Sequence, residues 1–259
     1  MRRSASIGNR LTPYITALLL LLIWEAAVRL NHLPAYILPS PLQITQTLAA
    51  TFSLLFMHAV STLEEALLGF LLAIGIAFVT AFVFNRFSWL NQAVYPLLIV
   101  SQTIPIITLA PLFLIWFGWG ILPKIIVVIL VCFFPIVISL LNGLNAVDPD
   151  LINLFRSMGA SQLAIFKMVK LPLALPSFFS GLKISASYSI MAAVIGEWLG
   201  SERGLGYFMT IAQKSFQVDR VLAAVVIIAL ISLLIVKAVD LAEWFLTPWN
   251  RRQEKWEID

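Results

Sequence analysis

The chain has 259 residues and a formal net charge of +4, with 61% hydrophobic residues, only 12% charged residues and a mean hydropathy of +0.96. The charged fraction is about half that of an ordinary soluble domain, which excludes a water-soluble globular protein and favours an all-α membrane protein. The basic residues stand between long apolar runs, where they serve to orient a protein in a membrane, so we expect no nucleic-acid partner.

The first apolar run extends from Leu11 to Trp24 and follows three arginines within the first ten residues. A secretory signal peptide begins in the same way, but it also carries a cleavage site between small residues. Glu25 and Arg29 follow here instead, so we expect an uncleaved signal anchor that forms the first membrane span. Residues 1–57 would comprise this helix and an outer segment.

Six segments are long and apolar enough to cross a bilayer, which requires about 20 mostly apolar residues in a helix. They lie near residues 12–30, 62–84, 92–117, 125–145, 178–200 and 221–246. None shows the alternation of a β-barrel strand, so all six are predicted to be helices. The membrane core is expected at residues 58–246, followed by a cytoplasmic tail at 247–259.

The distribution of basic residues predicts that both termini lie in the cytoplasm, because cytoplasmic loops carry an excess of Lys and Arg. Of the 17 basic residues, this orientation places twelve at the inner face: Arg2, Arg3, Arg10, Arg86, Arg156, Lys167, Lys170, Lys183, Lys237, Arg251, Arg252 and Lys255. The other five fall at the outer side: Arg29, Lys124, Arg203, Lys214 and Arg220.

The second span carries small residues at every fourth position: Gly69, Ala73, Ala77 and Ala81. Such a face allows another helix to approach closely. We expect this face to pack within the subunit, with a dimer seam as the alternative.

The stretch between the fourth and fifth spans has the sharpest local signals of any loop. Asp148 can cap a helix that begins at Pro149, and Gly159 suits the left-handed position after its end. Ser161 can cap a second short helix that extends to Lys170, beyond which prolines are expected to stop it. The sequence therefore predicts a structured helical elbow.

This stretch resembles the cytoplasmic "EAA" loop of binding-protein-dependent ABC importer permeases. The resemblance is carried by Gly159-Ala160-Ser161, Val169-Lys170-Leu171-Pro172 and Leu175-Pro176. It implies a type I importer fold in which the loop is a coupling helix that inserts into a groove of an ATPase subunit. The implied coupling residues are Asn153, Leu154, Phe155, Arg156, Gly159, Ala160, Ser161, Leu171 and Pro172.

The loop departs from the family pattern at one place. Asn153, Leu154 and Phe155 stand where the family has Glu-Ala-Ala, so the acidic docking contact is missing. A more apolar contact is expected instead, and the sequence does not identify the ATPase residues on the other side of it.

The resemblance covers residues 58–246 and includes Ser101-Gln102-Thr103-Ile104-Pro105, Trp116-Phe117-Gly118 and Gly196-Glu197-Trp198-Leu199-Gly200. Permeases of the nitrate, sulfonate and taurine group are the most similar, and within it those for thiamine pyrimidine precursors or riboflavin. The resemblance implies a multi-pass protein of the bacterial cytoplasmic membrane. Its implied partners are two ATPase copies, an outer or periplasmic solute-binding protein and a second permease copy.

The chain lacks the residue patterns of an enzyme or a cofactor-binding protein. No G-x-x-x-x-G-K-S/T motif occurs, so ATP is expected to bind a partner subunit and this chain is expected to hold no cofactor. Cys132, His32 and His58 form neither a disulfide pair nor a recognisable metal-ligand pattern. We expect no catalytic residue and no metal site.

Polar residues inside the spans are the candidates for a solute path, because such groups are costly in hydrocarbon. The candidates are Ser101, Gln102, Pro105, Tyr188, Glu197 and Trp198. Other roles stay open: Glu197 could reach the outer interface or pair with Arg203, and Ser101 and Gln102 could satisfy backbone groups freed by Pro105. Glu65 is expected at a solvated helix terminus.

The most favoured solute is a thiamine pyrimidine precursor, with an aliphatic sulfonate, taurine or nitrate as the alternative. An anion path would be expected to contain Arg or Lys at depth, but between Phe87 and Lys183 the basic residues lie at span ends or in the loop. A proton-coupled secondary carrier and a membrane scaffold remain as readings of another class.

Overall fold

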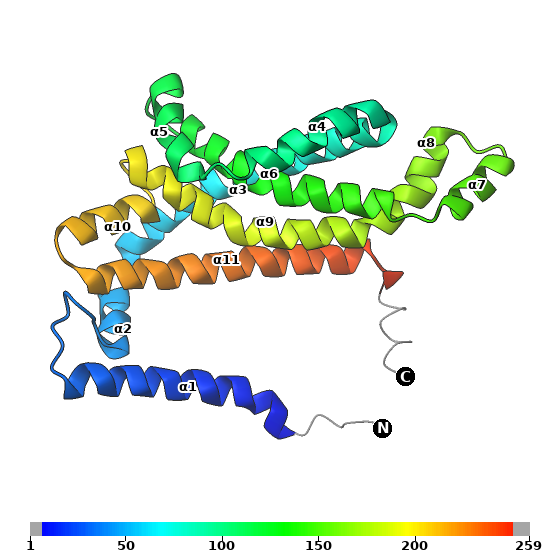
Figure 1. The fold of residues 1–259 in the computed structure, drawn as a ribbon. Helices are drawn as coiled ribbons and strands as arrows, with labels where there is room; N and C mark the ends of the chain where they lie inside the picture. The colour runs from blue at the N-terminus through cyan, green and yellow to red at the C-terminus, as the bar shows by residue number, and fades with distance from the viewer. Residues whose placement is uncertain (1–6, 251–259) are drawn as a thin grey trace.

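A computed structural model of the protein describes residues 7–250, and every regular element in this range is a helix (Figure 1). In chain order they are α1 Ile7–Leu30, α2 Pro41–Ala50, α3 Phe52–Arg86, α4 Ser88–Ser101, α5 Ile106–Phe117, α6 Leu122–Asn145, α7 Pro149–Ser157, α8 Gln162–Ile165, the π-helix η1 Phe166–Lys170, α9 Leu171–Gly200, α10 Leu205–Lys214 and α11 Val218–Leu246. The predicted all-α membrane fold is confirmed. Most of the predicted tail, including Arg251, Arg252 and Lys255, lies outside the described residues, as do Arg2 and Arg3.

Five of the six predicted spans are continuous helices that are long and apolar enough to cross a membrane. The prediction of one helix over residues 92–117 is wrong, because the chain bends by 98° between α4 and α5. Ile104 precedes a proline, which disfavours helical backbone at that residue, and Pro105 has no N–H to continue the ladder. Pro105 instead takes extended backbone and begins the next helix as its N-cap.

The core of the bundle is formed by α3, α6 and α9. Ala73, Ala77 and Ala81 are fully buried on one face of α3. A Cβ at Gly69 would lie 2.5 Å from Cβ of Val128 on α6, so only a residue without a side chain allows the two helices this close approach. The prediction that the small-residue face packs within the subunit is confirmed.

The fifth and sixth spans are joined by charged as well as apolar contacts. Val239 of α11 is buried in the core. Lys183 of α9 pairs with Asp240 of α11 at 2.9 Å and with Glu243 at 2.6 Å. These charged side chains are partly exposed and so are not fully enclosed by the protein.

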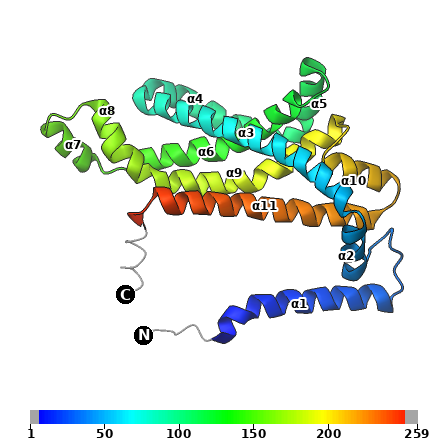
Figure 2. The same cartoon turned by 180° about the vertical axis from the view of Figure 1, so that it is seen from behind.

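The ends of the bundle carry different elements. Both views show α7 and α8 at one end and α2, α5 and α10 toward the other (Figures 1 and 2). The first turns of α1 and the last turns of α11 point toward the α7–α8 end, as an even number of crossings requires. Along its described side chains α1 is almost entirely exposed, and only Val28 is buried.

Candidate functional site

The connection between α6 and α9, residues 148–170, forms the predicted elbow. The Asp148 carboxylate accepts the N–H of Asp150 at 2.8 Å and caps α7, and the Ser161 hydroxyl accepts the N–H of Ala164 at 3.2 Å and caps α8. Between them Gly159 has a φ of 81°. The caps and the left-handed glycine predicted from the sequence are therefore confirmed.

Gly159 closes the end of α7 in a Schellman motif. The N–H of Ala160 donates to the carbonyl of Phe155 at 3.0 Å, and the N–H of Gly159 donates to the carbonyl of Arg156 at 2.9 Å. These two bonds satisfy carbonyls that would otherwise be left open at the helix end, and they require positive φ at the glycine. No atom lies within 4 Å of a Cβ built at Gly159, so a side chain would have room there. Glycine is favoured only because of the positive backbone φ.

The prediction that prolines stop the second short helix is wrong. Helical structure continues from Gln162 to Gly200, with Pro172 in the first turn of α9 and Pro176 inside it. The intervening residues 166–170 form a π-helical turn, closed by a bond from the N–H of Leu171 to the carbonyl of Phe166. The wider turn precedes Pro172, where a proline lacks the N–H for a regular helical bond.

The predicted coupling residues do not all lie on one surface. Leu154 and Met158 are 56% and 74% exposed at the tip of the elbow, and no residue of α7 is buried. Leu171 and Pro172, in contrast, are half-buried in the first turn of α9. The elbow thus offers an exposed apolar tip on a helix held rigidly by its caps.

The bend between α4 and α5 opens a pocket of 390 Å³, which we call the break pocket. It brings together four of the six predicted path residues, Ser101, Gln102, Pro105 and Tyr188, although Tyr188 comes from α9. The remaining lining is apolar: Ile104, Ile106, Leu109, Leu130, Val131, Phe134, Pro135 and Met191. Among residues 7–250, none with a charged side chain lines the break pocket.

Ser101 also bonds the backbone at the end of α4, but not the group that the alternative reading named, since the missing N–H of Pro105 would leave open the carbonyl of Ser101 itself. Its hydroxyl donates to the carbonyl of Leu98 at 2.8 Å, while the N–H of Gln102 turns to the carbonyl of Ile99 at 3.3 Å. In a regular helix the N–H of Gln102 would have bonded Leu98. Ser101 therefore replaces a bond that is lost where α4 ends.

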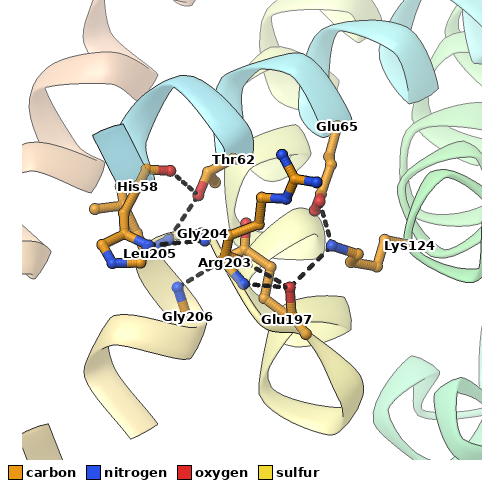
Figure 3. Close-up of polar contacts among 10 residues, drawn as sticks. His58, Thr62, Glu65, Lys124, Glu197, Arg203, Gly204, Leu205 and Gly206 are labelled. Carbon is orange, nitrogen blue, oxygen red and sulfur yellow. Dashed lines mark hydrogen bonds and ion pairs between the residues drawn. The ribbon is translucent and has the colours of Figure 1, made fainter. Parts of the chain in front are cut away.

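Glu197 lies apart from the break pocket, in a buried polar group that we call the capping cluster (Figure 3). Its carboxylate accepts the N–H of Gly206 at 2.5 Å, in the first turn of α10. His58 Nδ1 and the Thr62 hydroxyl, both from α3, accept the N–H groups of Gly204 and Leu205 at 3.1 and 2.8 Å. Three successive N–H groups of a helix start are thus satisfied by three side chains.

Gly204 has no side chain with which to cap its own helix, and its φ is 108°. A Cβ there would overlap the carboxylate of Glu197. The N-terminus of α10, the positive end of its dipole, faces this carboxylate. Trp198, the next residue, is 45% exposed and lies in neither the break pocket nor the capping cluster.

A buried ion pair completes the capping cluster. Lys124, at the start of α6, contacts the carboxylate of Glu65 on α3 and also donates to the hydroxyl of Ser201 at 3.0 Å. Glu65 and Lys124 are only 2% and 5% exposed. The expectation of a solvated Glu65 is wrong, since α3 begins at Phe52 and not near residue 62.

Sequence reasoning missed the rest of the cluster because its members are far apart in the chain. Charge counting by itself places Lys124 only at the outer side, and neither His58 nor Thr62 belongs to a recognisable motif. One available signal was the spacing of Thr62 and Glu65, which places them with His58 on one face of a helix.

Three comparisons bear on the family of the chain. The family model described as "binding-protein-dependent transport system inner membrane component" matches residues 69–252. A formylaminopyrimidine transport permease protein of Halalkalibacterium halodurans is 38% identical over 94% of this chain and 97% of that protein. A riboflavin transport system permease protein of Chloroflexus aurantiacus is 35% identical over 91% of this chain and 89% of that protein.

A more distant relative carries a different name. A putative aliphatic sulfonates transport permease protein of Bacillus subtilis is 30% identical over 90% of this chain and 85% of that protein. Among solved structures, a chain from "Inward facing conformations of the MetNI methionine ABC transporter" superposes with a TM-score of 0.60 at 20% identity. It covers 74% of this chain and 94% of that chain, and at this identity it supports the fold alone.

Proposed function

Because this chain belongs to the family of binding-protein-dependent transport system inner membrane components, we propose that it forms the path of an ATP-driven importer for a thiamine pyrimidine precursor. The observation that carries the solute assignment is the break pocket. Its lining is apolar except for a serine, a glutamine and a tyrosine, and it holds no charge. A flat, neutral heterocycle can stack on Tyr188 and form hydrogen bonds with Gln102.

The assembly that we propose contains two copies of this permease, two ATPase subunits and an outer solute-binding protein. ATP binds the ATPase subunits, and the exposed tip at Leu154 and Met158 inserts into each of them. The two permeases then rock between inward-open and outward-open forms. The rigid capping of α7 and α8 supports this role, because a structured elbow transmits a displacement that a flexible loop would absorb.

The solute assignment predicts that the gene is required for uptake of formylaminopyrimidine in a strain that cannot make the thiamine pyrimidine. Tyr188→Ala should lower uptake about 5- to 150-fold, since stacking and packing are worth about 1–3 kcal/mol per aromatic ring. Tyr36→Ala is the matched control, because Tyr36 is exposed and does not line the break pocket. Uptake is measured with labelled substrate in whole cells.

Two results would reject this solute. One is unaffected pyrimidine uptake in cells without the gene. The other is loss of growth of the same cells on taurine or an alkanesulfonate as the only sulfur source, which would favour the sulfonate alternative. Equal uptake by Tyr188→Ala and by the Tyr36→Ala control would show that the break pocket is not part of the solute path.

The proposed orientation predicts a simple labelling pattern. In a Cys132→Ser background, a cysteine at Ser53 should react with a membrane-impermeant maleimide in intact cells, and a cysteine at Ser157 should react only after permeabilisation. Both serines are exposed, at the start of α3 and in the elbow. The reverse pattern would place the elbow outside and exclude contact with a cytoplasmic ATPase.

A further inference from the structure

A second pocket, of 580 Å³, lies where the elbow meets the junction of α3 and α4. We call it the basic pocket, because Arg86, Arg156 and Lys170 line it and no carboxylate is among its described lining residues. The three residues come from α3, α7 and η1, so the fold and not a local charge run brings them together. The charges of Arg156 and Lys170 lie close enough to repel each other.

The positive charge in the basic pocket is not neutralised by the protein within residues 7–250. The Arg86 guanidinium lies 5.2 Å from the ring centre of Phe87, and Lys170 Nζ donates to the amide oxygen of Asn85 at 2.9 Å. Neither contact supplies negative charge, and among the described residues none of the three cations has an ion-pair partner. Cations that line one pocket without a counter-charge favour a bound anion.

The surroundings of the basic pocket indicate where that anion comes from. Phe82 and Leu163 line the pocket and are 38% and 53% exposed, so part of its lining is apolar and accessible from outside the protein. Trp89, in the first turn of α4, is 68% exposed, as expected of an aromatic anchor at a membrane surface. The pocket therefore lies where α3 ends and α4 begins, one residue from an exposed aromatic side chain.

We propose that the basic pocket binds the phosphate headgroup of an anionic phospholipid, with the acyl chains against Phe82 and Leu163. The proposal rests on the proposed function in one respect, since the elbow must face the cytoplasm, where the leaflet is anionic. The headgroup would bridge Arg86 of α3 to Arg156 and Lys170 of the elbow. It would thereby hold the elbow against the bundle.

The test is a lipid titration of the purified full-length permease, read by native mass spectrometry. The wild-type protein should bind phosphatidylglycerol more tightly than phosphatidylcholine. Arg86→Gln and Lys170→Gln should each weaken phosphatidylglycerol binding about fivefold, from about 1 kcal/mol per basic residue. Lys167→Gln is the matched control, because Lys167 is exposed in the same π-helical turn and does not line the pocket.

Glycerol phosphate, added alone, separates the lipid from a soluble phosphate compound. If it binds as tightly as phosphatidylglycerol, or if Arg86→Gln binds the lipid as wild type does, the proposal is overturned. Loss of ATPase association in Arg86→Gln with unchanged lipid binding would make the pocket a protein contact and would also overturn it. A permease that binds the lipid as expected but associates with no ATPase would contradict the proposed function and not the lipid site.

Discussion

Replacing Lys124 with methionine is expected to lower the free energy of unfolding by about 3–5 kcal/mol, because it leaves buried carboxylates without a counter-charge. Glu65 pairs with Lys124, and Glu197 lies in the same buried cluster. One oxygen of each carboxylate has no hydrogen-bond partner among the described residues. No further donor is therefore in place to compensate for the loss of Lys124. Unfolding of the purified protein in mixed micelles measures the loss.

The control for this prediction is Lys183→Met. Lys183 also pairs with two carboxylates, but its side chain is 37% exposed. The loss there should be about 1 kcal/mol or less, since exposed pairs contribute little. The double variant Lys124→Met/Glu65→Gln should recover part of the loss, because one buried charge is then removed. Equal losses at Lys124 and Lys183 would contradict the buried-pair argument.

Replacing Gly159 with valine is expected to reduce transport to a tenth or less of the wild-type rate, while the protein remains inserted. Valine rarely adopts positive φ, and forcing it there costs about 1–3 kcal/mol, about as much as the two Schellman bonds contribute. The elbow would therefore open at Gly159 and change the direction of α7. Transport and ATPase activity of reconstituted complexes are the measurements.

Two variants separate backbone strain from other effects of the substitution. Gly159→Asn should retain much of the transport, because asparagine tolerates the left-handed region. Gly75→Val adds the same side chain to an exposed position of α3, where a Cβ has no atom within 4 Å, and should leave transport unchanged. Normal transport by Gly159→Val would exclude the coupling role of the elbow.

Local chemistry made the elbow predictable in detail. Asp148 and Ser161 cap helices through bonds to residues two or three positions ahead, and Gly159 is required by bonds that span six residues. All of these partners are visible in a short window of sequence. The prediction that the helix stops at Pro172 is wrong, because the π-helical turn that accommodates the proline has no comparably strong residue signal.

The two pockets show a different limit. Four residues of the break pocket are predictable individually, chiefly because polar groups in an apolar run are conspicuous, but the apolar pattern predicts a straight span and not the 98° bend that makes the cavity. Mean apolarity over residues 92–117 is the same for a straight helix and a broken one. The proline marked the position of the bend without setting its angle, which depends on the neighbouring helices.

The sequence by itself determined the membrane class, five of the six spans and the capped elbow, because span length and capping depend on residues that are close together in the chain. Only the tertiary structure decided that Glu65, Lys124 and Glu197 meet at the start of α10. Burying these charges is tolerable only once three helices have packed, since each then finds its counter-charge or its N–H group. Within the capping cluster, bonded residues lie up to 146 positions apart along the chain, as in the bond from Gly204 to His58, and no local pattern records such a distance.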